Sequence, residues 1–183
     1  LPKGSKFLLQ AHYENYHKGE EESTRIELTY CKRPENEVEW TLLNNFDILF
    51  KANTVSAESL THEVKEQTTI LGLYPHLHFI CKNLEVFAIK PDGTKHPILF
   101  IPRWDYMLQA KYVLKEPVKL PAGSVVYANA VFDNTVKNPV QPNDPIRDVV
   151  YAISEHDEMF TLTLFHTSTT ELNFGKCVAE ISD

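Results

Sequence analysis

The stretch Leu120-Pro-Ala-Gly-Ser-Val-Val-Tyr-Ala-Asn-Ala-Val-Phe-Asp-Asn134 joins a turn to a strand pattern. Pro121-Ala122-Gly123 is the turn signal, and the run 125–132 that follows is rich in β-branched and aromatic residues. Similar short segments separated by turn residues occur throughout the chain, at 6–13, 25–31, 83–89, 97–101 and 159–165. No long stretch has helical periodicity. The pattern therefore predicts an all-β fold built as an antiparallel β-sandwich.

The opening of the chain resembles this stretch. Leu1-Pro-Lys-Gly-Ser-Lys-Phe-Leu-Leu-Gln-Ala-His-Tyr-Glu-Asn15 is identical to 120–134 at six positions. Two interpretations are open, a shared turn-plus-strand signature or an internal duplication, and the matches out to the final Asn favour duplication. Duplication predicts that residues 1–45 are the last strands of an upstream domain plus a linker, and that 46–183 are the C-terminal domain.

Composition excludes several classes of protein. A net charge of −7 argues against nucleic-acid binding, which needs concentrated Lys and Arg. A hydrophobic content of 43% can fill a core, and no apolar run approaches the roughly 18 residues of a membrane span. Cys31, Cys81 and Cys177 form no CxxC and give no zinc signal. The Pro- and Asn-rich segment 135–151 predicts a long loop, a feature that is often functional.

A His-x-His pair is the first candidate for chemistry. His76-Leu77-His78 follows Tyr74-Pro75 at the end of an apolar strand pattern. Because residues i and i+2 of a strand face the same side, both imidazoles can reach one metal ion. Taken alone, the pair fits two surface histidines equally well.

Met159 adds a second signal. Phe160, Leu162 and Leu164 share one face that suits the core, so Met159 is expected on the other face. A thioether together with imidazole favours copper, particularly Cu(I). The sequence thus predicts a copper site made by His76, His78 and Met159, on two strands that must be neighbours.

The remaining histidines carry weaker signals. His12 alternates with Gln10 and Leu8 in a strand pattern and, taken alone, fits a packed strand histidine better than a ligand. Five others have no partner at ligand spacing and are expected to face solvent or to pack: His17, His62, His96, His156 and His166. The chain has no GxSxG, P-loop or HExxH motif.

Several motifs together resemble the copper type II, ascorbate-dependent monooxygenases, the family of the peptidylglycine α-hydroxylating and dopamine β-monooxygenases and their bacterial relatives. They are Leu9-Gln10-Ala11-His12-Tyr13, Pro75-His76-Leu77-His78, Pro102-Arg103-Trp104-Asp105-Tyr106, Phe132-Asp133-Asn134 and Asp157-Glu158-Met159. The resemblance covers most of the chain and implies that 46–183 is a jelly-roll-like copper-binding domain.

The resemblance also implies a chemistry. His76, His78 and Met159 would bind the copper at which oxygen is activated, and His12 would be one ligand of a second, electron-transferring copper. Ascorbate would supply electrons for hydroxylation of a C–H bond in a small-molecule or peptide substrate. The other two ligands of the second copper are an adjacent His-His pair, which this sequence lacks. The partner that supplies them would be the upstream domain of the same protein, and the fragment alone would be inactive.

Three positions depart from the peptide-hydroxylating members. Tyr74, Thr161 and Thr163 stand where those enzymes have an Arg, an Asn and a Tyr that anchor the substrate carboxylate. Nothing in the three cysteines matches the disulfide pattern of the animal enzymes, which favours an exported bacterial relative, periplasmic or extracellular. The rival hypothesis is a non-enzymatic β-sandwich binding module, or a copper-carrier domain, with vestigial metal ligands.

Overall fold

The structure, a computed structural model, describes residues 4–9, 19, 21–28 and 38–168. These residues form ten β-strands and no helix, so the prediction of an all-β fold is confirmed, and none of them belongs to a helix that could cross a membrane. The strands are β1 (Glu39–Asn44), β2 (Leu49–Phe50), β3 (Thr54–Glu63), β4 (Thr68–Leu77), β5 (Cys81–Ile89), β6 (Lys95–Ile101), β7 (Tyr112–Leu120), β8 (Val125–Asn134), β9 (Val149–Val150) and β10 (Phe160–Thr167).

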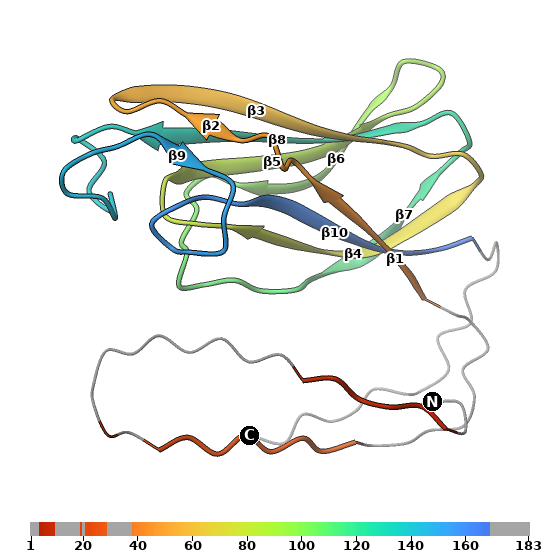
Figure 1. Cartoon of the computed structure of the whole chain (residues 1–183). Coiled ribbons are helices and arrows are strands. Elements are labelled where there is room, and N and C mark those ends of the chain that lie inside the picture. The colour runs from red at the N-terminus through yellow and green to blue at the C-terminus, as the bar shows by residue number, and fades with distance from the viewer. Residues whose placement is uncertain (1–3, 10–18, 20, 29–37, 169–183) are drawn as a thin grey trace. The chain divides into compact units, whose positions relative to one another are not determined.

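Eight of these strands form two packed antiparallel sheets (Figure 1). One sheet has the order β1-β10-β4-β7, and the other has the order β3-β8-β5-β6. The two-residue strands β2 and β9 pair with each other. The pairs are nested, since β1 pairs with β10, β3 with β8, β4 with β7 and β5 with β6. This is the double-sheet arrangement of a jelly roll.

Alternating side chains fill the space between the sheets. In β8, Val126, Ala128, Ala130 and Phe132 are buried while the residues between them are partly exposed. Phe132 stacks on Phe50 with 4.4 Å between ring centroids. The strict alternation places one face of each sheet in the core and the other face outside.

Two expected strands do not form in the described residues. The segments 6–9 and 25–28 have no strand assignment, whereas 83–89, 97–101 and 160–165 fall within β5, β6 and β10. A strand needs a hydrogen-bonded neighbour, and these two segments pair with none of the described strands. The remainder of the predicted strands 6–13 and 25–31 lies outside the described residues.

The sandwich starts before the expected domain boundary at residue 46. All six residues of β1 pair with β10, so 39–44 belong to the sandwich and not to a linker. The chain divides into two compact units, and the one comprising Arg33–Cys177 contains all ten strands. The assignment of the opening residues to an upstream domain remains a prediction. Gly4 and Gly123, which match in the repeat, both have positive φ, 89° and 82°, as a common turn requires.

The predicted loop 135–151 is present and includes β9. Buried Asn134 donates from Nδ2 to the carbonyl oxygens of Phe50 and Arg147, which ties both ends of this region to the sandwich. Beside it, Asp133 pairs with Lys82 at 3.2 Å. Burial acts to raise the pKa of Asp133, but hydrogen bonds with Thr135 and Lys82 outweigh it, and the pKa lies below its ordinary value.

Candidate metal site

His76 and His78 lie together at the end of β4. Their rings have centroids 5.2 Å apart at an angle of 82°. His76 is half-buried, and only 2% of the surface of His78 is exposed. Alternation along the strand therefore brings the two imidazoles side by side, as the sequence predicts.

Each imidazole has its Nδ1 atom occupied. His76 Nδ1 contacts Gln109 Oε1, and Gln109 Nε2 donates to the Tyr106 carbonyl at 3.1 Å, which fixes the orientation of the amide. His78 Nδ1 lies 3.1 Å from the carbonyl oxygen of Asp157. Since both partners are acceptors, each Nδ1 carries the proton. Each Nε2 then presents a lone pair, the tautomer that a metal-binding histidine uses.

The protonation state of His78 also suits a ligand. Desolvation by burial lowers the pKa of His78; the hydrogen bond with the Asp157 backbone opposes this, and nearby His76 lowers the pKa further. The neutral imidazole is consequently the favoured form, and a neutral imidazole is the form that binds metals.

Met159 lies next to this pair, immediately before β10. β10 pairs with β4, with Phe160 opposite Leu77 and Thr161 opposite His76, so the predicted neighbourhood of the two strands is confirmed. One further step along this antiparallel ladder brings Met159 opposite His78. Phe160 is fully buried in the core, whereas Met159 is half-buried and is not one of the core residues.

A buried carboxyl group ties the two strand ends together. Glu158 has no exposed surface, and its Oε1 accepts the backbone N–H of His78 and, at 2.9 Å, that of Met159. Burial raises the pKa of Glu158 to about 8. The sequence shows this residue only as part of the Asp-Glu-Met motif. The one local signal of its role is an acidic residue two positions before a buried strand.

Sequence reasoning also missed two neighbours contributed by the loop after β6. The ring of Tyr106 stands edge-on to His78 at 5.6 Å, and Gln109 orients His76. Both lie about 30 positions from the histidines in sequence, and no spacing rule connects them.

The three positions that depart from the peptide-hydroxylating enzymes lie beside the histidines. Thr161 pairs with His76, and Thr163 pairs with Tyr74 on the adjacent strand. Thr161 also donates its hydroxyl to the His76 carbonyl at 3.3 Å. This part of the sheet therefore offers hydroxyl groups and no fixed positive charge from these three positions.

Two other histidines of the segment 38–168 have partners away from this pair. His12 and His17 lie outside the described residues. His166 bonds Thr41 at 2.9 Å, and His156 contacts the Pro142 carbonyl at 2.9 Å. In the described part of the chain, no group of three or more His, Cys, Asp or Glu side chains is placed to bind a metal.

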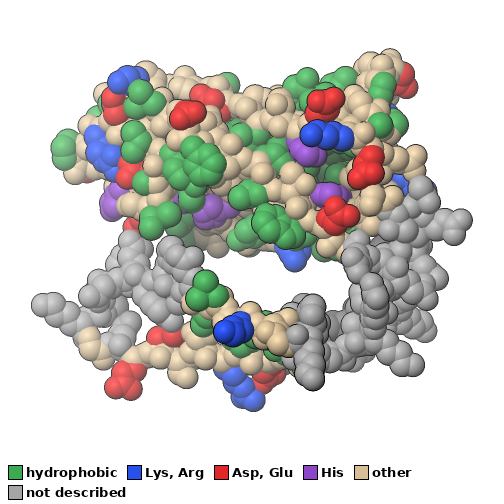
Figure 2. Space-filling model, turned by 45° about the vertical axis from the view of Figure 1, so that its right-hand side comes forward, with side chains coloured by type: hydrophobic (Ala, Val, Ile, Leu, Met, Phe, Trp, Pro, Cys, Tyr) green, Lys and Arg blue, Asp and Glu red, His purple; other side chains and the backbone are tan. Residues whose placement is uncertain are grey.

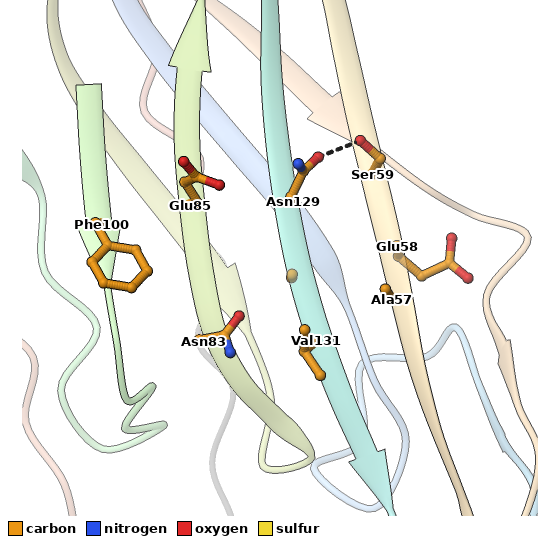
Figure 3. A pocket seen from close by; sticks show the side chains of 9 residues that line it. Ala57, Glu58, Ser59, Asn83, Glu85, Phe100, Asn129 and Val131 are labelled. Carbon is orange, nitrogen blue, oxygen red and sulfur yellow. Dashed lines mark hydrogen bonds between the residues drawn. The ribbon is translucent and has the colours of Figure 1, made fainter. Parts of the chain in front are cut away.

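Elsewhere, the outer face of the β3-β8-β5-β6 sheet has a shallow hollow lined by both polar and apolar side chains (Figure 3). Glu85, Asn129 and Ser59 line it from three adjacent strands, with Ser59 donating to Asn129 at 2.6 Å. Acidic and basic side chains are intermingled over the face of the sandwich seen in Figure 2. That face does not present the concentrated positive charge that nucleic-acid binding requires.

Comparison with known proteins adds no relative. No protein-family model matches the chain, and the search of curated proteins gives no significant match.

Proposed function

We propose that the chain contains the oxygen-activating copper half of a copper- and ascorbate-dependent monooxygenase that hydroxylates a C–H bond. The observation that supports this best is the geometry of the two imidazoles. Each Nδ1 lies at hydrogen-bonding distance from an oxygen acceptor, which leaves each Nε2 with a lone pair for a metal ion. Met159 at the adjoining strand end adds a soft donor, and the set of two imidazoles and a thioether suits Cu(I). When bound, copper would supply oxygen activation, with electrons drawn from ascorbate.

The protein groups have separate tasks in this proposal. Gln109 and the Asp157 carbonyl keep both histidines in the tautomer that can bind copper. One carboxyl oxygen of Glu158 accepts the backbone N–H groups of both His78 and Met159, which keeps the two strand ends together. The proposal includes export to the periplasm or extracellular space, and an upstream domain that brings the second copper and its ligands to His12.

Copper titration tests the site. Under reducing conditions, competition with bathocuproine disulfonate should give one Cu(I) per chain, bound more tightly than Zn(II). His78→Ala should weaken binding at least about ten-fold, whereas His96→Ala, on the opposite sheet in β6, should leave it unchanged. Equal Cu(I) affinity of His78→Ala and the unaltered chain would refute the assignment.

Oxygen consumption separates the enzyme from the rival hypothesis, a binding module or copper carrier. Because this sequence has no adjacent His-His pair, we expect that the chain alone does not catalyse the reaction. With ascorbate and copper, this chain should consume no more oxygen than free copper does. A longer parent protein with a His-His pair upstream should show substrate-dependent consumption. If that parent protein binds copper but consumes no oxygen, the copper-carrier hypothesis would be favoured.

A further inference from the structure

A pocket of about 630 Å³ lies beside the candidate copper site. Three segments form it: the start of β5 with the turn before it, the loop after β6, and the loop after β8. Its volume falls within the range of small-molecule sites. Phe79, Trp104, Tyr106 and Val140 give it apolar and aromatic walls.

The aromatic walls are held in place by ring packing and by a backbone hydrogen bond. Phe79 and Tyr106 lie with ring centroids 4.2 Å apart. The backbone N–H of Trp104 donates to the Lys82 carbonyl at 2.8 Å, which fixes this loop to β5. Flat walls of this kind suit a ligand with a flat apolar body.

Two donors of the pocket residues have no acceptor among the described residues. Only 8% of Trp104 is exposed, and its Nε1 is buried with no hydrogen-bond partner in this part of the chain. Such orphaned buried donors are rare in proteins and ask for an explanation. Arg103 is exposed, and its guanidinium makes no hydrogen bond or ion pair with any described residue. By contrast, Lys82 is neutralised by Asp133, and Asp105 accepts the N–H of Met107 at 2.9 Å.

We infer that this pocket binds a small amphipathic carboxylate, with an aromatic or similarly flat apolar body against Phe79, Tyr106 and Trp104 and the carboxylate at Arg103. This inference goes beyond the proposed monooxygenase and needs no copper. Since Tyr106 also contacts His78, the ligand would lie one side chain away from the candidate metal site.

The probe for the test is 3-phenylpropionate, with 3-phenylpropanol as the neutral partner of the same shape. The chain has two tryptophans, so Trp40→Phe leaves Trp104 as the single tryptophan fluorophore. Titration of that variant in a metal chelator should give a saturable change in Trp104 fluorescence, and calorimetry on the unaltered chain should give the same affinity.

Variants distinguish binding at the inferred site from nonspecific hydrophobic binding. Arg103→Gln should weaken 3-phenylpropionate about ten-fold, as expected for loss of a charge-assisted hydrogen bond, and leave 3-phenylpropanol within about two-fold. Lys111→Gln removes a cation that lies over Phe165, outside the pocket, and should change neither. Val140→Trp should fill the pocket and block both. Absence of saturable binding, or equal binding of 3-phenylpropionate by Arg103→Gln, would overturn the inference. Because copper is absent from the assay, failure here does not bear on the Cu(I) titration, which tests the proposed function separately.

Discussion

Replacing Glu158 by Leu should loosen the junction between the two strand ends. The carboxyl group accepts the buried backbone N–H groups of His78 and Met159, and Leu offers no acceptor to either. Leaving a buried donor unpaired costs about 1–3 kcal/mol. For two such donors, the free energy of unfolding should fall by about 2–6 kcal/mol, with the smaller figure expected if a water replaces one acceptor.

Glu158→Gln is the matched control, because its amide oxygen keeps an acceptor at the same reach. The free energy of unfolding of Glu158→Gln should fall by less than about 1 kcal/mol, the usual net contribution of one hydrogen bond. Glu116→Leu, at an exposed position of β7, should stay near the unaltered protein. Urea denaturation in the presence of a chelator measures all three, and a Cu(I) titration should rank them in the same order. A Glu158→Leu chain as stable as Glu158→Gln would refute the junction role.

Three further outcomes are expected. Gly72→Ala should lower stability by about 1–3 kcal/mol, because its Cβ would lie 2.7 Å from the backbone oxygen of Tyr112, and an unchanged thermal midpoint would contradict the close approach of β4 to β7. With the other two cysteines replaced by serine, Cys81 should react with a thiol reagent only after unfolding, because the thiol is buried and burial raises its pKa; rapid labelling of the native protein would count against this. The lowered pKa of Asp133 contributes stability above the ordinary carboxyl range, and this contribution is lost as pH falls through the folded-state pKa. Asp133→Asn should therefore show a smaller loss of stability on acidification below about pH 4 than the unaltered chain, and parallel acid curves would exclude the effect.

The sequence predicted the fold class because the central strands have strong signals. β5 and β8 alternate regularly, and β10 has its apolar residues on one face. β3 and β7 were missed. β3 is largely polar or charged, and the apolar residues of β7 are interrupted by charged residues and a proline. One side of each strand remains exposed. Their strand state is decided by partners far away in sequence, such as β8 for β3.

The candidate site was predictable only in part, for a similar reason. Strand alternation is a local rule, so the side-by-side placement of His76 and His78 follows from their spacing. The hydrogen bond from His76 to Gln109 and the burial of Glu158 depend on how the loop after β6 and the start of β10 meet β4. No local pattern encodes such meetings, and the described residues cannot test the expectation for His12.

The nested pairing of the strands has a consequence for biosynthesis. β10 is the last strand in chain order among the described residues, yet it is one of the two inner strands of its sheet, between β1 and β4. Until residue 167 has left the ribosome, β1 has no strand partner and β4 lacks one of its two. Contacts between segments so distant in sequence form slowly, because a long loop must close first. The nascent chain therefore exposes an unpaired, aggregation-prone edge of β4 until β10 pairs with it. His78 and Met159 come together only at that step.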